Sequence, residues 1–239
     1  LFVAVCEGVQ HAHRKGIIHR DLKPTNILVS EEGLRPTPKI IDFGIAKAVT
    51  EHLLEATVHT EVGRIIGTPD YMSPEQADVT ALDIDTRSDV YSLGALLYEL
   101  LCGSTVFGLS ERSAGLDEIR STILDKTPTR VSDRFLSGEL PGDVASRRGA
   151  SRDAHARLLR QDLDWITQKA LEKDRVRRYG SAAELAGDIR RFLAGGAVVA
   201  RPPSTGYRVR KFVRRNRGTV VAGAVLACAI ATATVTSTL

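Results

Sequence analysis

The stretch that decides the fold is HRDLKPTN at residues 19–26, followed by DFG at residues 42–44. The first motif offers a carboxylate, an ammonium group and an amide at Asp21, Lys23 and Asn26, and the second adds another carboxylate. Short β-rich runs lie between the two motifs, and turn residues separate these runs. We therefore predict a short β-hairpin at the two motifs.

Side chains of these types in this pattern suit the transfer of a phosphoryl group. The transferred group gains little covalent help from a protein, so positioning and charge neutralisation do most of the work. An aspartate beside a substrate hydroxyl can orient it and accept its proton. An amide oxygen and a second carboxylate can hold Mg²⁺ on the phosphates of ATP, and a lysine between them can neutralise developing negative charge.

The two motifs resemble the catalytic loop and the magnesium loop of eukaryotic-type protein kinases. The resemblance implies that Asp21 is the catalytic base and that Asn26 and Asp42 are ligands of Mg²⁺. It places Lys23 near the γ-phosphate of ATP. Leu28 matches the apolar residue that forms the floor of the adenine pocket in this family.

The resemblance also bears on substrate and regulation. The pair Lys23-Pro24 implies phosphorylation of serine or threonine rather than tyrosine, and Thr68 would contact the catalytic loop and help admit a hydroxyl substrate. Arg20 implies an activation loop that phosphorylation can order, because arginine pairs bidentately with phosphate. Candidate phosphosites in that loop, each of which could instead be an ordinary loop threonine, are Thr50, Thr57 and Thr60.

Further motifs follow in the order that the family uses. GTPDYMSPE at residues 67–75 matches the segment that closes the activation loop. Asp89 matches the aspartate that braces the catalytic-loop backbone, and Arg178 matches the arginine that forms a structural pair with Glu75. Four motifs in this order are a specific signal. The resemblance covers residues 1–195 and is nearest to bacterial membrane-anchored serine/threonine kinases, whose RPPS run is also present at 201–204.

Some family features are absent from the sequence. It contains no G-x-G-x-x-G motif, no strand lysine for the α- and β-phosphates and no partner glutamate, which the family carries upstream of the catalytic loop. The chain also opens at Leu1 within a helical pattern. We therefore expect a fragment that binds ATP poorly and turns over little by itself. Val106 departs from the family, and so does the polar stretch 128–156, which is interpreted as a surface insertion.

Helical periodicity dominates the rest of the chain. The resemblance implies an α+β fold, the mainly helical C-terminal lobe of a protein kinase. A helix at 86–102 looks apolar over much of its circumference, which predicts burial on most sides, with Gly103 just past its end. A later helix opens with Ser181 and Glu184, the spacing of a capping box. Other helices are predicted at 1–15 with Gly16 as C-cap, 116–125 and 162–171, and β-rich runs at 17–18, 27–29 and 39–41.

Composition agrees with one folded domain plus an appendage, since 43% of the 239 residues are apolar and 26% are charged. The three cysteines form no CxxC pair, which indicates a reducing compartment, no zinc site and a packing role. The histidines near the first motif are expected to pack rather than react. The cysteines are Cys6, Cys102 and Cys228, and the histidines are His11, His13 and His19.

The tail has two parts, a linker with a basic segment at 196–217 and an uncharged stretch at 218–239. The Pro/Gly-rich residues of the linker run from 194 to 207. About 20 apolar residues can span a bilayer as a helix, and basic residues before it favour the cytoplasmic side. We expect a single-pass transmembrane helix in a bacterial cytoplasmic membrane, with the kinase lobe at residues 1–195 in the cytoplasm. The alternatives are a buried or surface helix and a solvated linker. Acidic lipid is a simpler partner than nucleic acid for the basic cluster.

The function predicted from the sequence is therefore a membrane-anchored serine/threonine kinase that uses ATP and Mg²⁺ and acts on protein substrates, with a homodimer able to phosphorylate itself in trans. Two alternatives stay open. One is a catalytically inactive kinase-like scaffold. The other is a small-molecule phosphotransferase of the aminoglycoside type, which would not be expected to carry Lys23-Pro24 together with the 67–75 segment.

Overall fold

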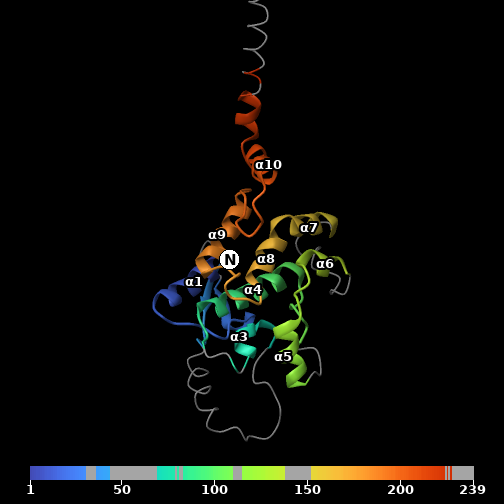
Figure 1. Cartoon of the computed structure of the whole chain (residues 1–239). Helices are drawn as coiled ribbons and strands as arrows, with labels where there is room; N and C mark the ends of the chain where they lie inside the picture. The colour runs from blue at the N-terminus through green and yellow to red at the C-terminus, as the bar shows by residue number, and fades with distance from the viewer. Residues whose placement is uncertain are drawn as a thin grey trace, which may run out of the picture.

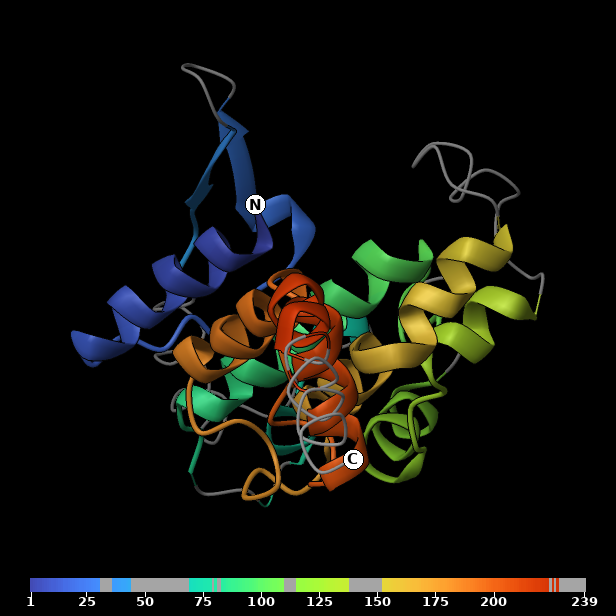
Figure 2. The same ribbon diagram turned by 90° about the horizontal axis from the view of Figure 1, so that it is seen from above.

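The computed structural model describes residues 1–30, 36–43, 69–78, 80, 83–109, 115–137, 152–223, 225 and 227. These residues form a helical lobe with one two-stranded sheet at its edge (Figures 1 and 2). The described elements are α1 Phe2–Arg14, η1 Pro24–Asn26, β1 Ile27–Ser30, β2 Thr37–Ile40, η2 Pro69–Tyr71, α3 Pro74–Ala77, α4 Thr86–Cys102, α5 Leu116–Asp125, α6 Val131–Leu136, α7 Arg152–Leu158, the π-helical turn η4 Leu159–Leu163, α8 Asp164–Ala170, α9 Ala182–Leu193 and α10 Thr205–Arg215.

Helix α4 is the centre of the lobe, as the sequence predicts. It begins where the Asp85 side chain accepts a hydrogen bond from the Arg87 N–H at 2.8 Å, and it ends at Gly103, whose φ of 81° suits a left-handed cap. Twelve of its 17 residues are buried, so it is covered on most sides. It packs against α1, α6, α8 and α9, which makes it the element that positions the others.

Helices α4 and α8 approach each other closely at Gly94. A Cβ added to Gly94 would lie 2.7 Å from the Cβ of Ala170 and 3.3 Å from its carbonyl carbon. Glycine at this position therefore lets the Ala170 methyl group of α8 lie directly against the backbone of α4.

The predicted hairpin is confirmed, with β1 and β2 antiparallel and Ile27 opposite Ile40. Figure 2 shows it at the edge of the lobe beside α1, with α6 and α7 at the opposite edge. The predicted β-run at 17–18 is wrong. The chain there leaves α1 in a Schellman motif, in which Gly16, at φ 74°, donates to His13 O and Ile17 N–H donates to Ala12 O. The cap at Gly16 explains why no strand begins there.

The described parts of the stretch 128–156 are not a surface insertion, contrary to the sequence interpretation. Val131 and Phe135 of α6 are 0% and 4% exposed. Ser132 donates from both its N–H and its Oγ to the buried carboxylate of Asp164, at 2.9 and 2.6 Å. The polar composition hid two helices: α6 packs against α4 and η4, and Ala156 of α7 is 4% exposed.

Helix α9 begins with half of the predicted capping box. Ser181 Oγ accepts from the Glu184 N–H at 3.2 Å, as expected. The Glu184 carboxylate, however, accepts from the Gly180 N–H at 2.9 Å instead of that of Ser181. The predicted helix at 162–171 is present as α8, and the π-helical turn η4 precedes it.

Part of the predicted linker is bound to the lobe. Val198 is 5% exposed, and the N–H groups of Val199 and Ala200 donate to the carboxylate of Asp188 in α9 at 2.7 and 2.8 Å. The basic residues that follow form α10, which stands at the end of the lobe away from α3 and α5 (Figure 1). Among the described residues, no helix is both long and apolar enough to cross a bilayer.

The contact at Gly94 gives a test of the packing. Gly94→Ala should destabilise the lobe by about 1–3 kcal/mol, because its methyl group overlaps Ala170. Gly187→Ala is the control: this position lies inside α9, and a Cβ there meets only the flexible end of Arg191, at 3.6 Å. It should be neutral or stabilise by up to about 1 kcal/mol through helix propensity. Urea unfolding of both variants checks the difference, and equal effects would contradict the proposed overlap.

Candidate catalytic site

A buried carboxylate on α4 holds the HRDLKPTN loop in place. Asp89 is 0% exposed, and it accepts hydrogen bonds from the backbone N–H groups of His19 at 2.8 Å and Arg20 at 2.9 Å. His13 Nε2 lies 2.7 Å from the same carboxylate. Asp89 also lies in the first turn of α4, where the helix dipole favours a negative charge. The bracing role expected for Asp89 is therefore present in the structure.

The loop that Asp89 holds has a strained backbone. Arg20 has a φ of 64°, in the left-handed region that side-chain-bearing residues seldom adopt. Such a residue persists only where its surroundings determine its conformation. Here Asp89 binds the N–H of Arg20, and Gln76 Nε2 donates to its carbonyl oxygen at 2.6 Å. Both backbone polar groups of the strained residue are thus fixed by side chains from other elements.

The strained turn presents the predicted catalytic side chains together. Lys23 Nζ lies 2.9 Å from Asp21 Oδ2, and Asn26 Nδ2 donates to Asp21 O at 2.8 Å and to Asp21 Oδ2 at 3.3 Å. Lys23 and Asp21 keep 21% of their side-chain surface exposed, whereas Asn26 is 5% exposed. The site is therefore a partly open carboxylate flanked by one ammonium group and one buried amide.

His19 joins this loop to the start of the DFG motif. Its Nδ1 accepts from the Asp21 N–H at 3.3 Å and its Nε2 donates to Ile41 O at 3.0 Å, a pair of bonds that only the neutral Nε2–H tautomer can form. Its ring also packs on Phe43, with centroids 4.7 Å apart. The sequence interpretation of His19 as a packing residue is confirmed, and the hydrogen bonds add a positioning role.

The two predicted magnesium ligands lie at the same end of the hairpin, with Asn26 just before β1 and Asp42 just after β2. The Ile41 N–H donates to Asn26 O at 3.0 Å, which places Asp42 next to the pair, and Asp42 itself has a φ of 55°. Because Asn26 Nδ2 is bound to Asp21, its Oδ1 is the atom left to accept or ligate. An amide oxygen with a carboxylate suits Mg²⁺, which prefers few protein ligands and takes the rest from phosphates and water. The residues therefore fit this ion.

The remaining predicted site residues are only partly described. Leu28, expected at the floor of the adenine pocket, is 52% exposed on the hairpin. Thr68 and the candidate phosphosites Thr50, Thr57 and Thr60 lie outside the described residues.

The segment after Thr68 is clamped to α4. Tyr71 OH donates to Glu99 Oε2 at 2.6 Å, and Ser92 Oγ donates to Tyr71 O at 2.7 Å. Burial and the neighbouring Glu99 carboxylate raise the pKa of Tyr71. Sequence reasoning missed Gln76 and Glu99, because their partners are distant in the chain and no local pattern marks them.

The predicted pair between Glu75 and Arg178 is confirmed as a bidentate contact, with Nη1–Oε1 at 2.6 Å and Nη2–Oε2 at 2.7 Å. Arg178 is 4% exposed, and its other N–H groups donate to backbone carbonyls. Burial alone would raise the pKa of Glu75. The Arg178 guanidinium, with a hydrogen bond from Ser88 Oγ, instead holds it below its usual value of 4.5.

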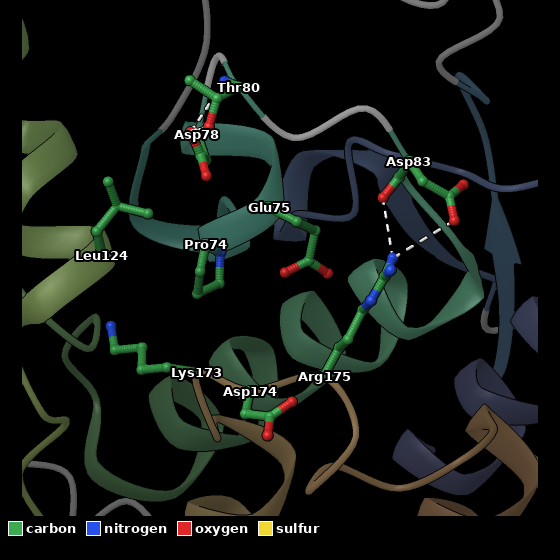
Figure 3. A pocket seen from close by; sticks show the side chains of 9 residues that line it. All are labelled: Pro74, Glu75, Asp78, Thr80, Asp83, Leu124, Lys173, Asp174 and Arg175. Atoms are coloured by element: carbon green, nitrogen blue, oxygen red, sulfur yellow. Dashed lines mark hydrogen bonds and ion pairs between the residues drawn. The ribbon is translucent and has the colours of Figure 1, made fainter.

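An open pocket lies beside this pair (Figure 3). Glu75 and Pro74 line it from α3, Leu124 from α5, and Lys173 and Arg175 from the loop after α8, with Arg175 reaching Asp83. Burial, together with nearby Arg178, lowers the pKa of Lys173 to about 8. None of the predicted catalytic residues lines this pocket, so it is separate from the Asp21 cluster.

The Glu75–Arg178 pair predicts how stability depends on pH. A carboxylate with a depressed folded pKa stabilises the fold above its unfolded pKa and loses that contribution as the pH falls through the folded value. Arg178→Met should cost about 3–5 kcal/mol, because it leaves Glu75 buried without its partner. The pKa of Glu75 should then rise above 4.5, so protonation on acidification should stabilise the variant.

Urea unfolding across the acidic range measures both effects. Arg175→Met is the matched control, since Arg175 is more exposed and forms looser contacts with Asp83 and Asp85, at 3.7 and 3.4 Å. A pH profile for Arg178→Met that parallels that of the unaltered chain would contradict the assigned role of the pair.

Comparisons with known proteins agree with this geometry. Residues 1–186 match the family described as "Protein kinase domain". Among curated proteins, a probable serine/threonine-protein kinase PknB of Bifidobacterium longum is 35% identical over 200 residues, covering 84% of this chain and 24% of that protein. The serine/threonine-protein kinase PknB of Mycobacterium leprae is 37% identical over 191 residues, covering 80% of this chain and 25% of that protein.

The chain therefore spans about a quarter of the length of the curated relatives it matches. A solved structure, a double mutant of the Mycobacterium tuberculosis PknI kinase domain, has a TM-score of 0.49 and 20% identity. That alignment covers 80% of this chain and 53% of that one.

Proposed function

This chain belongs to the protein kinase domain family, and we propose that it forms the helical lobe of a kinase that transfers the γ-phosphate of Mg·ATP to serine or threonine hydroxyls of proteins. The observation that carries the proposal is the Asp21 carboxylate. It is held between Lys23 and Asn26 on a loop whose strained backbone is fixed by buried Asp89. This arrangement agrees with the names of the relatives, which are serine/threonine kinases.

Each side chain has a distinct role in this proposal. Asp21 orients the substrate hydroxyl and accepts its proton. Lys23, 2.9 Å from Asp21, neutralises charge on the transferred phosphate and keeps the carboxylate from turning away. Asn26 Oδ1 and Asp42 would hold Mg²⁺, which supplies charge neutralisation at the phosphates of ATP. Leu28 would contact the adenine base.

The serine/threonine preference rests on Lys23-Pro24 and on Thr68, as the family resemblance implies. The contacts of Tyr71 and Gln76 support it, because they tie the end of the 67–75 segment to α4 and to the catalytic loop. An acceptor peptide gripped by that segment would lie beside Asp21. The Asp21, Lys23, Asn26 and Asp42 side chains are all present, which gives no support to the inactive-scaffold alternative.

Membrane attachment is the second part of the proposal. The uncharged residues 218–239 would form a single transmembrane helix, and the basic residues of α10 and Arg217 would lie on the cytoplasmic side with the kinase lobe. The positive charge of the residues before this stretch supports this orientation. A homodimer that phosphorylates its activation loop in trans belongs to the same proposal.

The catalytic assignment is tested by phosphate incorporation from Mg·ATP into a generic serine/threonine substrate, in the longest polypeptide that the gene encodes. Asp21→Asn should lower the rate about 10²–10⁴-fold by removing the base. Asp42→Asn should raise the Mg²⁺ concentration needed for half-maximal rate.

Asp83→Asn, an exposed carboxylate outside the site, is the control and should leave both values unchanged. Unaltered rates in both site variants, with the fold intact, would sink the proposal.

Membrane attachment is tested by extraction of cell membranes with alkaline carbonate. The full chain should stay in the membrane pellet, because a spanning helix resists the removal of peripheral proteins. A chain ending at residue 217 should move to the supernatant. Release of the full chain by carbonate would contradict the spanning helix.

A further inference from the structure

The basic helix α10 is docked on the lobe through a buried acid. Asp162 in η4 is 0% exposed, and it accepts a hydrogen bond from Tyr207 OH at 2.9 Å. Lys211 Nζ lies 2.6 Å from Asp162 Oδ2, and Arg201 Nη1 lies 3.7 Å from Asp162 Oδ1. A π-helical turn is an unusual local structure that often occurs at functional sites. Within the part of the chain that the structure describes, the cations near this carboxylate are Arg201 and Lys211, which both follow α9.

A second buried carboxylate fixes the chain just before α10. Asp188 receives the N–H groups of Val199 and Ala200, and the Val198 N–H donates to Tyr207 OH at 3.1 Å. Burial alone would raise the pKa of Asp188, but these donors hold it below its ordinary value. The two acids and Tyr207 therefore hold the start of α10 at a defined place on the lobe.

The charge around this helix has one sign. No acidic residue follows Asp188 in the sequence, whereas nine arginines and lysines do. Lys211 is compensated by Asp162, and Arg191 by Asp188. Within the described part of the chain, Arg208 and Arg215 form no ion pair, so their charges are available to a ligand.

These two arginines share a groove. Positions 208, 212 and 215 lie on one face of α10, since residues three, four and seven apart align on a helix. Together with Lys211 they line a groove of about 390 Å³ against the turn at Gly196 and Ala197. Arg215 bends toward that turn, with Nη1 3.8 Å from where a Cβ of Gly196 would lie. Phe212, 55% exposed, adds an apolar wall.

We propose that this groove binds the phosphate headgroup of an anionic membrane phospholipid. Two guanidinium groups suit a phosphate, and exposed Phe212 and Val209 beside them suit the boundary between headgroup and acyl chain. A phosphopeptide would use the arginines but leave the apolar wall in water. The proposal rests on membrane attachment through residues 218–239, which would bring the groove to the bilayer surface.

Its consequence is an orientation of the lobe. Figure 1 shows α10 at one end of the lobe, with α3 and α5 at the other. A lipid held in the groove would turn the end with α3 and α5 away from the membrane. The segment at 67–75, which is proposed to grip the acceptor peptide, ends at that side in α3.

The experiment places the full chain in phosphatidylcholine nanodiscs that contain a minor fraction of phosphatidylglycerol. Native mass spectrometry then identifies the lipids that remain bound after the disc is disrupted. Bound lipid should be enriched in phosphatidylglycerol relative to the disc. Arg208→Gln with Arg215→Gln should reduce that enrichment about thirtyfold, which is the scale of two lost contacts with anionic lipid.

The matched control is Arg210→Gln with Arg214→Gln, which removes the same charge from the opposite face of α10 and should leave the enrichment nearly unchanged. Equal losses in the two double variants, or no enrichment in the inserted chain, would overturn the proposal that the groove binds the headgroup. Any remaining attraction between α10 and anionic lipid would then be non-specific. Displacement of the lipid by millimolar inorganic phosphate would show a site for free phosphate and overturn the lipid assignment.

Failure of the anchor would appear differently. A chain that does not insert into the discs contradicts the membrane helix and leaves the groove to be tested by co-sedimentation with phosphatidylglycerol vesicles. In that assay the Arg208/Arg215 variant should lose binding while the Arg210/Arg214 variant keeps it. Equal binding by both variants would again overturn the groove.

Discussion

The structure depends on one buried carboxylate, that of Asp89. Removing a carboxylate from water costs several kcal/mol unless donors replace the lost hydration. Here the donors are two consecutive backbone N–H groups of the catalytic loop, at His19 and Arg20, with His13 beside them and the helix dipole of α4 behind. The same contacts that make this burial tolerable hold Arg20 in its left-handed conformation. The stability of the core and the geometry of the site are therefore coupled.

Helix α4 extends this coupling to the rest of the lobe. Through Glu99 and Ser92 it binds Tyr71, and through Ser88 it supports the Glu75–Arg178 pair. The segment at 69–75 and the HRDLKPTN loop are thus both bound to the same helix, α4. Such shared support is what a site needs if two chain segments must present a hydroxyl and its base to each other within fractions of an ångström.

The far end of the lobe uses the same device for another purpose. Asp162 and Asp188 are buried acids that bind residues after α9, so the chain leaves the lobe at a fixed place. A flexible linker would let the lobe turn freely. A docked one gives the candidate site and the basic helix a constant relation, with α3 and α5 at the end away from α10 (Figure 1).

The family and the central helix could be predicted from the sequence, and candidate site residues could be proposed from it, because these are local patterns. HRDLKPTN, the 3.6-residue periodicity of α4 and the caps at Gly103 and Gly16 are each readable within a few residues. Even the partners of Asp89 and Arg178 could be predicted, though only through resemblance. Assignments to Thr68 and to residues 218–239 remain predictions.

Tertiary structure alone decided what depends on distant partners. The bond from Gln76 to Arg20 and the burial of α6 follow from side chains that meet only after the helices pack. The docking of residues 198–211 on two acids is of the same kind, and composition suggested a linker there. Proline and glycine predict where regular structure stops, but they do not reveal whether the irregular segment that follows is solvated or bound. That choice rests on a carboxylate buried elsewhere in the chain, which no local pattern records.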